Sequence, residues 1–166
     1  MDIGGAISNW KRRRTCLPIL TVRPTVIARR HNYVEPNPDY QAMVFNTLKE
    51  EVAVATFGIS PLQDAVYLYG IDVKPQHRRK GYALGFLVWL SEEYNLPITP
   101  VHIVGSANSF WHAARQLGGG NLIVRDELRV SEMDEEKARW AHLIPEPEHI
   151  RLQRLCEASP DWKPLK

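Results

Sequence analysis

The first half of the chain alternates between apolar runs and short polar breaks. Residues 17–30, 41–48, 51–60 and 66–73 are rich in β-forming side chains, and the breaks at residues 31–40 and 61–65 contain Pro, Asn or Asp. Lys49 and Glu50 separate the second and third runs by a hairpin-sized turn. Residues 31–39 contain two prolines, which favour a loop over a long helix. The pattern predicts a first strand over residues 17–30 and an antiparallel meander of the three strands that follow.

The middle of the chain changes to helical patterning. Residues 81–95 are apolar almost all round, which predicts a helix buried against the sheet. Residues 101–104 predict a strand that is parallel to residues 66–73, because the connection between them is a helical crossover. Residues 108–117 predict the next helix, with Asn108 as its N-cap and the glycines at 118–120 at its end.

The C-terminal part predicts a last strand pair over residues 122–130 and 138–144, joined by an acidic turn at residues 131–136. A short helix over residues 149–157 and a polar tail follow. We therefore expect a basic extension over residues 1–16, one domain over 17–145, and a C-terminal helix and tail over 146–166. The predicted fold class is α/β (α+β), with a mixed, mostly antiparallel sheet of six to seven strands flanked by helices.

Composition narrows the class of protein. A chain of 166 residues with 44% hydrophobic and 24% charged residues fits a globular domain with a sizeable core. No apolar run reaches the roughly 20 residues that span a bilayer, and no signal peptide is visible. Cys16 and Cys156 lie at opposite ends and form no metal-ligand spacing. We expect a cytoplasmic protein without a metal site.

Charge is distributed unevenly. The net charge is +2, but residues 1–40 hold seven Lys/Arg against three Asp/Glu. The basic run consists of Lys11, Arg12, Arg13 and Arg14. Such a run can contact nucleic acid or an acidic protein, and it is more often a solvated tail.

A basic loop between the fourth strand and the apolar helix carries the most specific signal. Residues 74–80 (KPQHRRK) contain four cations if Lys74 is counted, and Gly81 follows. A strand that enters a helix through a tight loop leaves backbone N–H groups unpaired at the positive end of the helix dipole. We expect Gly81 to let that backbone approach a ligand, and a side chain there to intrude on it. The arrangement predicts a phosphate or pyrophosphate site.

The spacing Arg78-x-x-Gly81-x-Ala83 resembles the pyrophosphate loop of the GNAT superfamily of acyl-CoA-dependent N-acetyltransferases. The resemblance extends upstream to residues 71–75 (IDVKP) and downstream to a strand that leads into a helix at Asn108. It covers roughly a third of the chain. The resemblance implies a GNAT-like sheet with a central splay between two parallel strands, here residues 66–73 and 101–107, and acetyl-CoA as cofactor.

The resemblance also implies which residues hold the cofactor. Backbone amides near Asp72 and Val73 would pair with the pantetheine arm and polarise the thioester carbonyl. The implied cofactor-binding residues are Ile71, Val73, Gln76, Arg78, Arg79, Lys80, Gly81, Tyr82, Ala83, Asn108 and Trp111.

The acid and base that are usual in the family are missing from their expected positions. The position of the family's Tyr acid is Arg115, and that of its Glu base is Tyr67. Either the reaction proceeds without these groups, or His102, Asp72, Tyr67 or Tyr69 transfers protons through water, or the domain only binds acyl-CoA. Each candidate also has a structural interpretation: His102 and the two tyrosines as core residues, and Asp72 as an ion-pair partner of the loop.

The sequence thus favours an N-acetyltransferase that moves an acetyl group from acetyl-CoA to a primary amine of a small molecule, a protein or an aminoacyl-tRNA. The alternative is a non-catalytic acyl-CoA-binding or interaction module. Because the loop at residues 31–39 replaces the helices that usually wall the acceptor site, we expect an open cleft or one completed by a second subunit in a homodimer.

Overall fold

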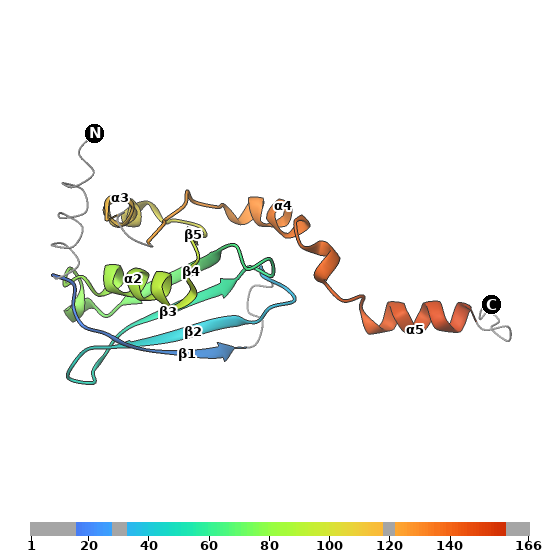
Figure 1. Ribbon diagram of the computed structural model, residues 1–166, viewed down its shortest axis with the longest axis horizontal. Helices are drawn as coiled ribbons and strands as arrows, with labels where there is room; N and C mark the ends of the chain where they lie inside the picture. Colours follow the sequence, from blue (N-terminus) through green and yellow to red (C-terminus); the bar gives the residue numbers. More distant parts are fainter. Residues whose placement is uncertain (1–15, 28–32, 118–121, 159–166) are drawn as a thin grey trace.

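The computed structural model describes residues 16–27, 33–117 and 122–158. Its centre is a five-stranded sheet whose strands lie in the order of the chain (Figure 1). The strands are β1 (Thr21–Ile27), β2 (Asp39–Phe45), β3 (Glu51–Ile59), β4 (Val66–Val73) and β5 (Ile98–Pro100). Each strand from β1 to β4 pairs with the next one in antiparallel orientation. The strand β5 pairs with β4 in parallel orientation. The predicted meander and parallel crossover are confirmed.

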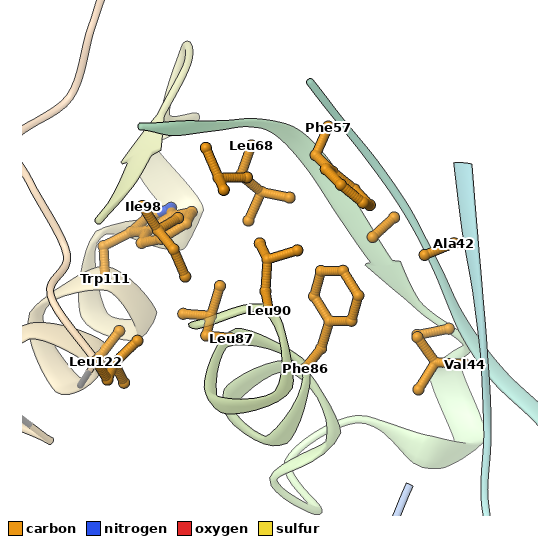
Figure 2. Packing of buried hydrophobic residues seen from close by; sticks show 14 of the residues in the cluster. Ala42, Val44, Phe57, Leu68, Phe86, Leu87, Leu90, Ile98, Trp111 and Leu122 are labelled. Atoms are coloured by element: carbon orange, nitrogen blue, oxygen red, sulfur yellow. The ribbon is translucent and has the colours of Figure 1, made fainter. Parts of the chain in front are cut away.

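The helix α2 (Tyr82–Tyr94) covers one face of the sheet. Its buried side chains Phe86, Leu87 and Leu90 pack against Phe57 and Leu68 of the sheet, as Figure 2 shows. Gly81 before the helix and Asn95 after it both have left-handed backbone, so the helix begins and ends where the sequence predicts. The short η1 (Pro75–His77) precedes it.

The other face of the sheet is partly covered by the turns at residues 33–38 and by a C-terminal segment. That segment contains η3 (Val130–Glu132), α4 (Met133–Ala138) and η4 (Ala141–Leu143). A second buried cluster lies beneath it, formed by Val34, Ala65, Tyr67, Val101, Met133 and Trp140. The coverage therefore comes from loops and short helices rather than from long helices.

Two further helices complete the described chain. The helix α3 (Asn108–Gln116) follows η2 (Gly105–Ala107) directly. The helix α5 (Glu148–Glu157) projects away from the body of the protein, with all its residues exposed (Figure 1). No helix among the described residues combines the length and apolar character needed to cross a membrane.

The predicted last strand pair is wrong. Residues 122–129 run extended but make only single bridges, from Val124 to Ile98 and from Val101 to Leu128. Residues 131–136, predicted as a turn, lie in η3 and α4, where Asp134, Glu135 and Glu136 occupy the first turn of α4 and favour a helix N-terminus. Residues 138–144 do not form a strand because Trp140 turns inward and is fully buried. The described sheet accordingly has five strands, not six or seven.

An ion-pair cluster fastens α4 to the sheet. Arg139 contacts both Asp64, in the β3–β4 connection, and Glu136 of α4. The Tyr67 hydroxyl donates a hydrogen bond to Glu136 Oε1 at 2.5 Å. Burial raises the pKa of Asp64, but hydrogen bonds and the charge of Arg139 outweigh it and hold that pKa below its usual value.

Candidate functional site

The two parallel strands separate after three paired residues. Residues 66–68 of β4 pair with β5, and the Val101 N–H still donates to the Leu68 carbonyl at 2.9 Å. His102 then adopts left-handed backbone with a φ of 57°, and its N–H donates to the carbonyl of Leu128. The chain thereby turns from β4 toward residue 128. The predicted splay is present, but β5 ends at Pro100 and the predicted strand at residues 101–104 is wrong.

The separated half of β4 presents a free edge. The Lys74 N–H donates to the Val52 carbonyl of β3, and Asp72 lies opposite Val54. Because alternate residues of an antiparallel ladder point to the same neighbour, Ile71 and Val73 direct their N–H and C=O groups away from β3. The Val73 carbonyl accordingly accepts a hydrogen bond from Arg78 Nε at 2.9 Å. Two backbone N–H groups therefore face the splay.

A cavity of about 580 Å³ occupies the splay. This volume lies within the range of small-molecule sites. Its walls come from β4, from the segment after β5, from the start of α2 and from α3. The lining residues are Leu68, Tyr69, Gly70, Ile71, Asp72, Val73, Arg78, Ala83, Pro100, Val101, His102, Ile103, Val104, Ser106, Ala107, Phe110 and Trp111.

The basic loop brings the N-terminus of α2 to this cavity. Arg79 and Gly81 both have left-handed backbone, with φ of 58° and 84°. No acidic residue stands in the first turn of α2, and no side chain caps it. Ala83, in that turn, lines the cavity. The first N–H groups of the helix therefore lie beside the cavity, and no carboxylate of the first turn competes for them.

Gly81 serves the fold in a way that the sequence did not reveal. A Cβ atom at this position would lie 3.1 Å from Pro18 Cδ and 3.5 Å from Leu17 Cδ2. These residues belong to the segment before β1, so a side chain would press on that segment first. The positive φ of Gly81 adds a further reason for glycine. A side chain at Gly81 would therefore disturb the packing of residues 17 and 18 in addition to any effect on a ligand.

Five of the eleven predicted cofactor-binding residues line the cavity: Ile71, Val73, Arg78, Ala83 and Trp111. The other six do not line it: Gln76, Arg79, Lys80, Gly81, Tyr82 and Asn108. Asn108 is the first residue of α3 rather than its N-cap, and it makes no side-chain capping bond.

The three catalytic candidates separate clearly. His102 lines the cavity and is exposed, so its interpretation as a core residue is wrong. Asp72 also lines the cavity, and its carboxylate lies 3.5 Å from Arg78 Nη2, as its ion-pair interpretation predicts. Tyr67 is buried in the second cluster and does not line the cavity. Burial, followed by the hydrogen bond and charge of Glu136, raises the pKa of Tyr67.

Tyr69, the remaining candidate for proton transfer, has a hydrogen-bond partner that the sequence did not indicate. Tyr69 lines the cavity, and its hydroxyl donates to Asp39 Oδ1 at 3.0 Å. Asp39 is only 1% exposed. Burial, followed by the charge and hydrogen bond of Asp39, raises the pKa of Tyr69, so the phenol remains a proton donor. Asp39 followed two prolines in a predicted loop, and nothing in the sequence indicated a partner 30 residues away.

Solved structures of two acetyltransferases resemble the chain. An aminoglycoside antibiotic 6'-N-acetyltransferase from Acinetobacter baumannii is 16% identical, with 61% of this chain and 90% of that chain covered and a TM-score of 0.38. A nourseothricin acetyltransferase is 15% identical, with 61% and 72% covered and a TM-score of 0.38. No protein-family model matches the sequence. A search of curated proteins finds no match.

Proposed function

We propose that the protein is an acetyl-CoA-dependent N-acetyltransferase that acts on a primary amine of a small molecule, a protein or an aminoacyl-tRNA. The observation that carries this proposal is the free edge of β4, where the N–H groups of Ile71 and Val73 face a cavity that extends to the N-terminus of α2. An extended amide-bearing arm fits a free strand edge, and a pyrophosphate fits a helix N-terminus.

The residues present suit this cofactor. Ile71 and Val73 would pair with the amide groups of the pantetheine arm through their backbone. Arg78 and the first N–H groups of α2 would hold the phosphates, beside the small side chain of Ala83. Phe110 and Trp111 supply an apolar wall. When bound, acetyl-CoA supplies an acetyl group activated as a thioester.

The remaining chemistry is the stabilisation of charge and the removal of a proton. The N–H groups on the free edge of β4 can donate to a developing oxyanion, and this effect is commonly worth about 10²–10³-fold. The exposed imidazole of His102 lines the cavity and can accept a proton from the acceptor amine through water. A thiol with an ordinary pKa of about 8.5 leaves tolerably well, so the chain does not require an acid where Arg115 stands.

Calorimetric titration with acetyl-CoA tests the proposal at its first step. We expect saturable binding, and then turnover with at least one acceptor in a panel of amines, peptides and aminoacyl-tRNA. Absence of binding at millimolar acetyl-CoA would rule the proposal out. Binding of free coenzyme A with similar affinity would indicate that the arm and phosphates supply most of the binding energy.

A non-catalytic acyl-CoA-binding module is the second candidate. It is favoured by the position of two residues that replace the usual acid and base. Arg115 interacts with the Arg125 carbonyl and lies 4.0 Å from Asp126, and Tyr67 is bound to Glu136. This candidate predicts cofactor binding without turnover. Reproducible acetylation that is lost on replacing His102 would exclude it.

Contact with nucleic acid through Lys11, Arg12, Arg13 and Arg14 stays a prediction, because these residues lie outside the described ranges. Its expected sign is an affinity that falls steeply with salt. Removal of residues 1–14 should then abolish the binding.

A further inference from the structure

Tyr69 occupies an irregular position in β4. Leu68 lies opposite Phe57 of β3, whereas Gly70 lies opposite Thr56, so Tyr69 is an extra residue between two consecutive partners. This is a β-bulge, a device that redirects the residues that follow it. Tyr67 and Tyr69 both pack with the second cluster, whereas Ile71 and Val73 pack with the cluster beneath α2. The strand therefore changes its alternation at Tyr69.

The bulge decides which N–H groups reach the cavity. A shift of pairing by one residue turns every later group of a strand to the other side. Without the extra residue, Ile71 would lie opposite Val54, in the position where Asp72 now faces β3. Its N–H, and that of Val73, would then be directed into the sheet. The bulge therefore determines that Ile71 and Val73, rather than Gly70 and Asp72, present their N–H groups at the cavity.

The side chain of Tyr69 is fastened at its far end. Its hydroxyl reaches Asp39 of β2 across Gly58 of β3, and the ring of Tyr33 packs against it edge-on at 5.4 Å between centroids. A Cβ atom on Gly58 would lie 2.1 Å from the Tyr69 hydroxyl. The phenol therefore lies directly over a glycine and ends on a buried carboxylate. This contact links three neighbouring strands.

We propose that Tyr69 is a positioning residue for acyl transfer: its hydrogen bond to Asp39 holds the β4 bulge, and the bulge directs the N–H groups of Ile71 and Val73 into the cavity. The inference rests on the proposed function. The side chain of Tyr69 acts by holding the bulge in place and does not transfer a proton to the substrate.

The test compares Tyr69→Phe with Tyr67→Phe. Tyr67 lies on the same strand and the same face, its hydroxyl is also bound to a carboxylate, and it does not line the cavity. We expect Tyr69→Phe to speed amide hydrogen exchange of Asp72 and Lys74, whose N–H groups face β3, by roughly 10- to 100-fold in the free protein, as for loss of a bond to a charged group. Acetyl-CoA affinity should fall by about tenfold. Tyr67→Phe should lower the melting temperature without either change.

A conservative variant gives the reverse check. Asp39→Asn keeps an oxygen that can accept the Tyr69 hydrogen bond, so amide exchange of Asp72 and Lys74 and acetyl-CoA affinity should stay close to parent values. If Tyr69→Phe does not fold, the double variant Tyr69→Phe/Asp39→Asn also removes the buried charge of Asp39, which has lost its bond to Tyr69. We expect this double variant to show the changes in exchange and affinity that are predicted for Tyr69→Phe.

The outcomes separate the two proposals. If the parent binds no acetyl-CoA, the proposed function fails, and the positioning role fails with it. If the parent binds acetyl-CoA but neither Tyr69→Phe nor the double variant changes amide exchange at Asp72 and Lys74, the positioning role alone is overturned. Equal exchange effects in Tyr69→Phe and Tyr67→Phe would also overturn it, because they would indicate general loosening of the sheet.

Discussion

Replacement of Ala83 by glutamate should weaken acetyl-CoA binding without weakening the fold. Ala83 lies in the first turn of α2 and lines the cavity, so a carboxylate there would face any phosphate held by the helix N-terminus. At roughly 6 Å and an effective dielectric constant of about 20 to 80, each pair of negative charges costs about 0.7–2.8 kcal/mol. This corresponds to a loss of affinity of roughly 3- to 100-fold per phosphate charge.

The effect on stability should have the opposite sign. The first turn of α2 has no acidic residue. A carboxylate in that turn typically stabilises a helix by about 0.3–1 kcal/mol. For a chain of this length, the melting temperature should stay the same or rise by about 1–4 °C. A loss of binding can then not be attributed to partial unfolding.

Calorimetric affinity and thermal unfolding, each measured at low and high salt, check this prediction. Ala83→Gln is the matched control, because it has nearly the same size without the charge. The difference between the two variants should shrink as salt rises, since the Debye length falls to about 3 Å at 1 M. If Ala83→Glu binds as tightly as Ala83→Gln at low salt, the phosphates do not lie at this helix, and the assignment of the loop is wrong.

Three further predictions concern other parts of the molecule. Gly81→Ala should lower the free energy of unfolding by about 1–2 kcal/mol, because the residue has a positive φ and its new Cβ would press on Pro18. Gly105→Ala should not lower it, because the space around its new Cβ is open. Chemical denaturation of both variants measures the two free energies of unfolding. His102→Asn, which tolerates left-handed backbone, should reduce turnover by about 10²–10⁴-fold with little change in acetyl-CoA affinity by calorimetry. The fold lowers the pKa of Asp64, so the stabilisation that this carboxylate contributes is complete above the pKa of 3.8 in the unfolded chain and is lost as the pH falls below that value. Asp64→Asn should therefore make the melting temperature less dependent on pH between pH 6 and pH 3.

The sequence was most informative where local chemistry decides the structure. The strand at residues 66–73, the helix that follows and the caps at Gly81 and Asn95 were predicted because alternation, apolar content and end residues all agree there. The meander and the parallel crossover follow from short and long connections. Ile71, Val73 and Ala83 line the cavity in the splay, and their role in holding a cofactor stays a prediction.

The errors lie where distant contacts override local preference. Residues 138–144 have an apolar content that suits a strand, but burial of Trp140 against the sheet bends them. His102 leaves the sheet because its N–H pairs with Leu128. The Tyr69–Asp39 bond joins residues 30 positions apart, and a bulge leaves no signature in composition. Such features depend on register, which single-sequence patterns do not specify.

The order of the strands has a consequence for how the domain assembles. From β1 to β4 every neighbour in the sheet is also the next strand in the chain, so these contacts are local and can form early in folding. The strand β5 joins only after α2 has crossed the sheet, and it does so through three residue pairs. The cleft is therefore completed by the least local and shortest pairing in the described sheet. A molecule bound across it would join the early-forming and late-forming parts of the domain, and would slow unfolding from the C-terminal side.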